Sequence, residues 1–335
     1  MKTNSNTVPI ISMAEIHHKT SARKIDTACR EWGFFQVVDH GIDAQVLRNL
    51  RTQMRTFFAQ SQKSKRQIER TLRNPWGYYD QELTKNVRDW KQVYDYGFGF
   101  EDDQGFRSEP QWPEAMPEFR PALQAYYHAC EKLAQSLLTL IAQNLHTNAT
   151  ELRESFGQQH TSFLRMNYYP VCPAPEVPNG EAEPVDGHLG LNRHTDAGAL
   201  TLLLQDEQPG LQVFNRGRWH LVEPVAGAIT VNIGDIVQVW SNDQYKAALH
   251  RVLANSESER FSIPFFYNPQ REMNYAPLSG TVNERCPPRY SAINWGEFRD
   301  SRVAGDYADL GEEIQISHYA IPEVSSAMEA RYGFC

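Results

Sequence analysis

The chain has 335 residues, 41% of them hydrophobic and 22% charged, and this composition indicates a globular protein with a large buried core. Its net charge of −8 and its scattered Lys and Arg residues argue against a nucleic-acid partner. Apolar stretches are too short for a signal peptide or membrane span, and five cysteines without a CxxC pair favour a reducing compartment, so we expect a cytoplasmic protein without a membrane partner.

Helices are expected in the first half of the chain. Apolar residues recur at helical intervals over residues 21–63 and 114–157. Within the first segment, GFFQVVDHGI (33–42) predicts a short strand that ends at a glycine turn. A loop rich in Pro and Gly follows at 170–190. Residues 1–157 are therefore predicted to form a mostly helical region.

Short strands are expected after this loop. The segments are rich in β-branched and aromatic residues and are separated by Gly, Asn and Pro. They are GALTLLLQD (198–206), LQVFNRGRWHLV (211–222), AITVNIGDIVQVWS (228–241), HRVLAN (250–255) and RFSIPFFYN (260–268). This pattern predicts an antiparallel barrel or sandwich, so the fold class is mainly β with flanking helices.

A pair of metal-binding side chains precedes the first of these strands. His194 and Asp196 are one residue apart, and in an extended strand they would point to the same side. His250, at the start of HRVLAN, offers a third ligand from another strand. Two imidazoles and one carboxylate leave about half of an octahedral shell open, as in non-haem ferrous oxygenases. An isolated HxD is common by chance in a chain with eleven histidines, so this prediction needs further support.

A candidate anion receptor lies ten residues after His250. Arg260 and Ser262 share one face of the predicted strand. The planar guanidinium binds a carboxylate through two hydrogen bonds, and a buried Arg needs an anionic partner. A small dianionic acid that chelates iron at one end and pairs with Arg260 at the other satisfies both sites.

These residues belong to an ordered set of motifs. Together the set resembles the Fe(II)- and 2-oxoglutarate-dependent dioxygenases of the isopenicillin N synthase-like superfamily, over roughly residues 8–270. Its members are WGFFQVVDHGI (32–42), RMNYYPVCPAPE (165–176), HTD (194–196), GLQVF (210–214), NIGD (232–235), SNDQYKAALHRV (241–252) and RFS (260–262).

The resemblance implies a fold, cofactors and site residues. It implies a double-stranded β-helix, a jelly-roll or cupin-like core, at 158–275, wrapped by N-terminal helices in a single catalytic unit (1–335), with a C-terminal extension (276–335) covering the core. Iron(II) would be bound by His194, Asp196 and His250. The cosubstrate 2-oxoglutarate would be bound by Arg260, Ser262, Tyr169 and Asn167. With dioxygen, the enzyme would release succinate and carbon dioxide and oxidise an unactivated C–H bond by hydroxylation, desaturation or ring closure.

Other side chains are weighed against ordinary structural roles. The aromatic segments 74–82 and 88–100 are expected to pack between helices and barrel, but relatives use this region for substrate, so Tyr78, Arg88 and Tyr94 are candidate substrate contacts. Phe265 is expected either in the core or in the pocket. The remaining histidines are not expected to bind iron: His188 in a loop, His40 in a turn, and His17 and His18 at the surface.

Two alternatives stay open. The first is an iron-dependent oxidase of the same fold that does not use 2-oxoglutarate. The second is an inactive barrel that serves as a binding module, which has no need for a complete open metal site. The substrate is expected to be a small molecule of secondary metabolism, and the absence of a sustained heptad pattern favours a monomer.

Overall fold

The computed structural model describes residues 7–14, 19–101, 104–157, 159–176, 187–308 and 311–322. His17 and His18, part of the Pro- and Gly-rich loop and the end of the C-terminal extension therefore lie outside the described residues. In the part of the chain that is described, no helix is both long enough and apolar enough to cross a membrane.

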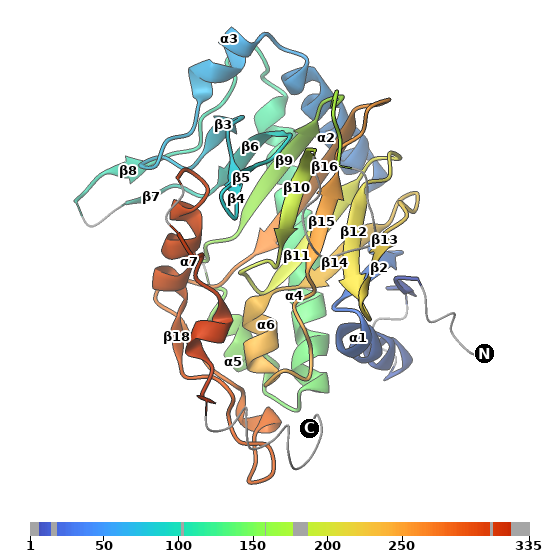
Figure 1. The fold of residues 1–335 in the computed structure, drawn as a ribbon, viewed down its shortest axis with the longest axis vertical. Helices are drawn as coiled ribbons and strands as arrows, with labels where there is room; N and C mark the ends of the chain where they lie inside the picture. The colour runs from blue at the N-terminus through green and yellow to red at the C-terminus, as the bar shows by residue number, and fades with distance from the viewer. Residues whose placement is uncertain are drawn as a thin grey trace.

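The largest element is a sheet of eight strands. Their order is β1–β2–β14–β11–β16–β9–β6–β3, and all neighbours except β1 and β2 are antiparallel (Figure 1). The strands are β1 (Ile10–Ser12), β2 (Phe34–Val38), β3 (Gly77–Tyr79), β6 (Gln92–Gly97), β9 (Phe163–Tyr169), β11 (Leu200–Gln205), β14 (Ile229–Ile233) and β16 (Arg260–Tyr267).

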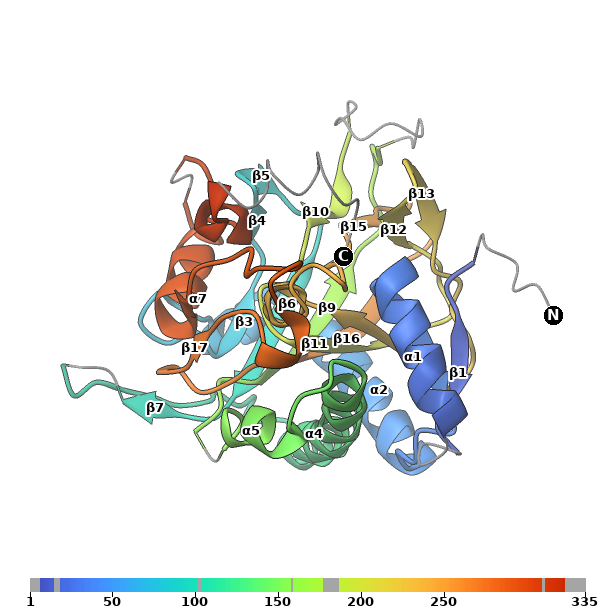
Figure 2. The same cartoon turned by 90° about the horizontal axis from the view of Figure 1, so that it is seen from below.

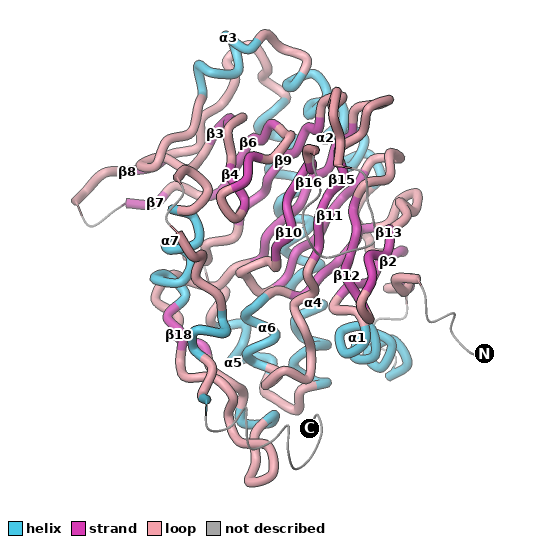
Figure 3. Tube along the Cα trace, in the orientation of Figure 1, coloured by secondary structure: helices cyan, strands magenta, loops and turns pink. Residues whose placement is uncertain are grey.

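A second sheet of four strands faces the first. It has the order β10–β15–β12–β13, with β10 (Leu189–His194), β12 (Leu211–Asn215), β13 (Arg218–Leu221) and β15 (His250–Leu253). Figure 3 shows these strands gathered in the middle of the molecule. The two facing sheets enclose a cavity lined by side chains from both of them. This is the arrangement of the predicted double-stranded β-helix.

Three long helices cover the other face of the eight-stranded sheet. They are α1 (Lys19–Glu31), α2 (Ala44–Phe58) and α4 (Phe119–Asn144), and Figure 2 shows them together on one side of the strands. Helix α2 begins where the Asp43 side chain accepts a hydrogen bond from the Gln45 amide at 2.7 Å. Helix α4 buries a face of leucines and aromatics and contacts β9, β11 and β16. Burial of these apolar stripes against the sheet positions the strands.

Shorter elements complete the described chain. The helices are α3 (Gln62–Lys65), α5 (Ala149–Glu154), α6 (Asp235–Trp240), α7 (Trp295–Ala304) and the 3₁₀ turns η1 (Arg66–Ile68), η2 (Ser279–Thr281) and η3 (Ile316–Tyr319). The two-stranded pairs are β4 (Leu83–Thr84) with β5 (Val87–Arg88), β7 (Phe100–Glu101) with β8 (Arg107–Ser108), and β17 (Asn274–Tyr275) with β18 (Ile293–Asn294).

Two segments differ from the expected secondary structure. The first half of the chain contains β1 to β8 as well as helices, and the aromatic segments at 74–82 and 88–100 supply β3 and β6 to the large sheet. The second segment, 235–240, forms α6 where a strand was expected. Nearly all of its side chains are buried, and periodicity alone does not distinguish a short buried helix from a short buried strand.

Candidate active site

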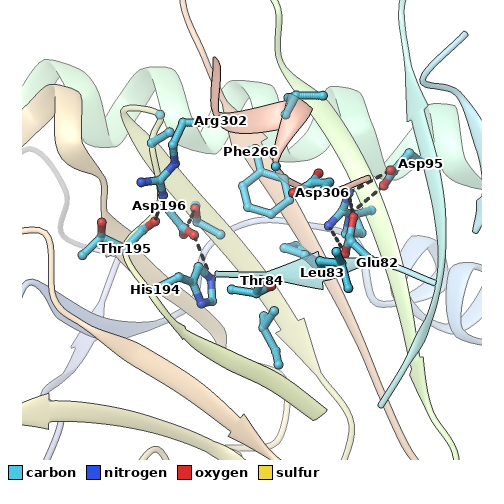
Figure 4. A pocket seen from close by; sticks show the side chains of 18 of the residues that line it. Glu82, Leu83, Thr84, Asp95, His194, Thr195, Asp196, Phe266, Arg302 and Asp306 are labelled. Atoms are coloured by element: carbon cyan, nitrogen blue, oxygen red, sulfur yellow. Dashed lines mark hydrogen bonds and ion pairs between the residues drawn. The ribbon is translucent and has the colours of Figure 1, made fainter. Parts of the chain in front are cut away.

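The three predicted metal ligands meet between the sheets. His194 ends β10 and pairs in register with His250, which begins β15. Asp196 lies two residues after the end of β10, where its carboxylate reaches the two imidazoles. Asp196 Oδ1 is 3.4 Å from His194 Nε2 and 3.6 Å from His250 Nε2. The three ligand atoms lie within 4.8 Å of one another, which suits coordination of one ion. Figure 4 shows two of these ligands, His194 and Asp196.

Both imidazole rings are oriented by their own strands. His194 Nδ1 is 2.8 Å from the Asn192 carbonyl, and His250 Nδ1 is 3.0 Å from the Ala248 carbonyl. A carbonyl only accepts, so each Nδ1 donates its hydrogen and each Nε2 keeps a free lone pair. Burial, and then the neighbouring His194, lower the pKa of His250 to about 4. Its imidazole is therefore neutral near pH 7, as a metal ligand must be.

The carboxylate of Asp196 is held by two polar side chains from neighbouring strands. Thr201 Oγ1 and Asn232 Nδ2 both donate to its Oδ2, the latter at 2.7 Å. Burial raises the pKa of Asp196, whereas the two histidines, when protonated, and the Asn232 hydrogen bond lower it below its ordinary value. The acid therefore stays ionised, with Oδ1 turned toward the histidines.

Sequence analysis did not identify these two orienting residues. Asn232 lies in the NIGD motif, and it is the cross-strand partner of Thr201 in the β11–β14 pair. Their proximity depends on strand register, which the sequence does not provide. A third unpredicted contact comes from α7, where Arg302 Nη2 donates to the Thr195 carbonyl at 2.8 Å, between the two ligands.

Replacing Asn232 with alanine is expected to weaken ferrous-ion binding by roughly 10- to 100-fold, as is typical when a group that orients a metal ligand is removed. Anaerobic titration with Fe(II) measures the effect. The control is Asn49→Ala, in which an exposed asparagine of α2 is lost. Equal iron affinity in the two variants would show that Asn232 does not orient Asp196.

The predicted anion receptor lies deeper between the sheets. Arg260 is only 2% exposed, and its Nη2 donates to Gln205 Oε1 at 2.9 Å. Its Nε and Nη1 are buried without a hydrogen-bond partner among the described residues. A buried guanidinium with unused donors is costly unless an anion completes its bonds. The two unused donors of Arg260 therefore suit a carboxylate ligand.

The other predicted cosubstrate residues lie beside Arg260. Strand register places Tyr169 opposite Arg260 and Asn167 opposite Ser262. The Tyr169 ring is 5.0 Å from the guanidinium carbon, and Asn167 Nδ2 donates to Ser262 Oγ at 3.4 Å. Asn167 Oδ1 is buried without a partner among the described residues. These side chains form one polar group on the inner face of the large sheet.

The metal ligands and this polar group line a single cavity of about 590 Å³. This volume is in the range of small-molecule sites. Its wall is completed by apolar side chains of both sheets and by residues 295, 299, 301–307 and 311–314 of the C-terminal segment. Figure 4 shows Arg302 of this segment close to Asp196.

The structure places the four candidate substrate contacts outside the cavity lining. Tyr78 and Tyr94 are paired on β3 and β6 and pack against Phe57 of α2, and Phe265 packs edge-on against Tyr127 of α4. All three side chains are fully buried on the helix-covered face of the sheet. Their neighbours in sequence, such as Asp95 and Phe266, face the cavity instead because side chains alternate along a strand.

Arg88, His188 and His40 lie outside the cavity lining and contact other parts of the chain. Arg88, the fourth candidate substrate contact, is exposed on β5, donates to the Asp80 carbonyl at 3.2 Å and lies outside the cavity lining. His188 is exposed and lies against Trp90, with ring centroids 4.9 Å apart. His40 bridges a turn: its Nδ1 accepts from the Ile42 amide, and its Nε2 bonds the Gly227 carbonyl at 2.8 Å.

Two family models match this chain. Residues 160–269 match the 2OG-Fe(II) oxygenase superfamily, and residues 8–115 match the N-terminal region described as non-haem dioxygenase in morphine synthesis. The first range contains all three metal ligands, Arg260 and the residues that orient Asp196.

Individual relatives cover most of the chain. Jasmonate-induced oxygenase 1 of Arabidopsis thaliana is 34% identical over 298 residues, which are 87% of this chain and 71% of that protein. A 1-aminocyclopropane-1-carboxylate oxidase of Musa acuminata is 32% identical over 88% of this chain and 93% of its own. The crystal structure of JOX2 in complex with 2OG, Fe and JA superposes with a TM-score of 0.79 at 31% identity, covering 94% of this chain and 90% of that one. Motifs, geometry and relatives agree: the chain belongs to the 2OG-Fe(II) oxygenase superfamily.

Proposed function

We propose that this protein couples the oxidative decarboxylation of 2-oxoglutarate to the oxidation of an unactivated C–H bond in a small molecule of secondary metabolism. As a member of the superfamily it is a 2-oxoglutarate-dependent dioxygenase that uses Fe(II) and dioxygen. One observation carries the proposal: an open His–Asp–His site and a buried guanidinium with unused donors share the same cavity.

We assign the following roles to the chain's own residues. His194, Asp196 and His250 would hold the iron on one side and leave its other positions open. Arg260 would bind the distal carboxylate of 2-oxoglutarate, with Ser262 and Tyr169 donating hydrogen bonds and Asn167 beside them. The bound iron, cosubstrate and dioxygen supply the oxidant and release succinate and carbon dioxide.

Part of the remaining cavity wall is apolar and has a second task, which is to exclude water. Phe34, Leu191, Leu203 and Val252 line the cavity, and none of these side chains competes for the metal. The Phe34 ring lies edge-on to His250, with centroids 5.3 Å apart. These apolar side chains beside the open metal positions would keep water away from the substrate carbon that is oxidised.

Removal of the metal is expected to stop turnover. With Fe(II) present, succinate should form from 2-oxoglutarate under air. A small molecule that is a substrate, identified by screening, should raise the rate of succinate formation. Treatment with EDTA should lower succinate release to background, and added Fe(II) should restore it, because the protein's site is open and reloadable. Product mass then identifies hydroxylation, desaturation or ring closure.

Two results would contradict the proposal. Oxygen consumption without succinate formation would identify an iron-dependent oxidase that does not use 2-oxoglutarate. The absence of a 2-oxoglutarate-dependent metal-to-ligand absorption band on anaerobic titration with Fe(II) would identify a binding module. The expected monomeric state, cytoplasmic location and lack of a nucleic-acid partner rest on the sequence alone.

A further inference from the structure

A group of buried ionic side chains lines the cavity on the side of β6 and β9. We call it the ionic network; its members are Arg70, Glu82, Asp89, Lys91, Asp95 and Arg165. Their side chains are at most 14% exposed. All of them except Asp89 belong to the cavity lining. The network is distinct from the metal ligands and from Arg260.

The ionic network neutralises its own charge. Arg165 pairs with Asp95 at 2.7 Å and with Glu82 at 2.9 Å. Lys91 pairs with Glu82 at 2.7 Å and with Asp89 at 2.8 Å. Arg70 pairs with Glu82 at 2.6 Å and also with Asp95. Three cations thus match three carboxylates.

Asp306 is a fourth carboxylate beside this balanced group. Its backbone is fixed, because its amide donates to Val303 and its carbonyl accepts from Leu83, both at 3.1 Å. Its side chain lines the cavity and makes no hydrogen bond or ion pair with any described residue. Figure 4 shows it at the same end of the cavity as Glu82 and Asp95, opposite His194 and Asp196.

The environment of Asp306 does not favour an isolated negative charge. Burial and then the nearby Glu82 raise its pKa to about 7, against the lowering effect of the network's cations. The short ion pairs of these cations are formed with Glu82, Asp89 and Asp95, and none is formed with Asp306 among the described residues. A ligand that brings one positive charge would complete the balance of this end of the cavity.

We propose that Asp306 determines substrate specificity by binding a protonated amine of the primary substrate. The inference rests on the proposed function and names its substrate class. Pro264 and Phe266 of β16 line the cavity beside the ionic network, on the strand that also carries Arg260. They offer an apolar surface to the carbon skeleton. The substrate is thus a small amine with a hydrophobic body.

Two cations that also line the cavity, Lys85 and Arg299 of α7, would instead select a carboxylate. Lys85 is exposed, so water solvates its charge. Arg299 and Asp306 are both partly exposed, but their nearest charges differ: Arg299 has the opposite charge of Asp300 beside it, whereas Asp306 has the like charge of Glu82. A group next to a like charge has more need of an opposite charge from a ligand, so Asp306 is the stronger determinant.

Matched amines, acids and alcohols test this proposal. The probes are benzylamine, benzoate and benzyl alcohol; phenethylamine, phenylacetate and phenethyl alcohol; and the cyclohexylmethyl counterparts of the first set. Succinate release and thermal stabilisation are measured with Fe(II) and 2-oxoglutarate present. We expect the amines to exceed the acids and alcohols of the same skeleton. Asp306→Asn should reduce the amine-to-alcohol ratio of kcat/KM by roughly 10- to 100-fold.

Two further variants separate recognition from a structural role. Asp306→Glu should retain most of the amine preference, and Asp300→Asn, which changes an exposed carboxylate outside the cavity lining, should leave it intact. A preference for acids that Arg299→Gln removes, an unchanged ratio in Asp306→Asn, or no response to any amine would each overturn the inference. If the wild-type protein forms no metal-dependent succinate even before a substrate is added, that result would instead count against the proposed function.

Discussion

Replacing Asp196 with alanine is expected to reduce succinate release at least about 100-fold, because removing a ligand costs more than removing a group that orients one. Asp196 is the only carboxylate of the described metal-ligand group, and its Oδ1 lies within 3.6 Å of both imidazole nitrogens. Without it, two histidines remain to hold a divalent ion. Anaerobic Fe(II) titration and succinate release measure the loss.

His250→Ala should give a loss of the same order, since it removes another of the three ligands. The matched control is His188→Ala, because His188 is exposed and lies outside the cavity lining. Circular dichroism confirms that each variant is folded. If the Asp196 variant kept the wild-type affinity for Fe(II), or if His188→Ala were as damaging as His250→Ala, the assigned metal site would be wrong.

The second large effect is expected from Arg260→Gln, which should raise the KM for 2-oxoglutarate by roughly 10- to 100-fold. A hydrogen bond to a charged group contributes about 1.5–3 kcal/mol. The glutamine retains a donor for Gln205 but loses the charge and the paired donors that a carboxylate needs. The rate at saturating 2-oxoglutarate should fall less, because the metal ligands are unchanged. Steady-state succinate kinetics separate the two parameters.

Thermal unfolding gives an independent measurement of this effect. A ligand that binds only the folded protein stabilises it, so 2-oxoglutarate with Mn(II) should raise the melting temperature of the wild type more than that of Arg260→Gln. Arg55→Gln is the control, because Arg55 lies over Phe261 of the same strand but is half exposed and outside the cavity lining. An unchanged KM in Arg260→Gln would remove Arg260 from the cosubstrate site.

The sequence was most informative where function requires particular side chains at fixed spacing. Arg260 and Ser262 do lie on one face of a strand, and the motifs before and after them carry the family resemblance. The metal ligands also meet, although the reason differs from the one expected, because Asp196 follows the end of β10. Local spacing therefore predicted which residues converge but not the backbone path that brings them together.

What the sequence could not provide was the pairing of strands. Tyr94 and Phe265, the candidate substrate contacts, lie one position away from Asp95 and Phe266, which face the cavity. Side chains alternate between the two faces of a strand, but only the assembled sheet shows which face is covered by helices. For the same reason the contact of Asn232 with Asp196 depended on register between β11 and β14.

The assigned metal ligands and the assigned contacts to 2-oxoglutarate come from different sheets. His194 and His250 belong to the four-stranded sheet, and Arg260 belongs to the eight-stranded sheet. A cosubstrate attached to the metal at one end and to Arg260 at the other would therefore link the two sheets of the barrel. Succinate is one carbon shorter than 2-oxoglutarate, so it would span the two sheets less well and would leave the cavity more easily.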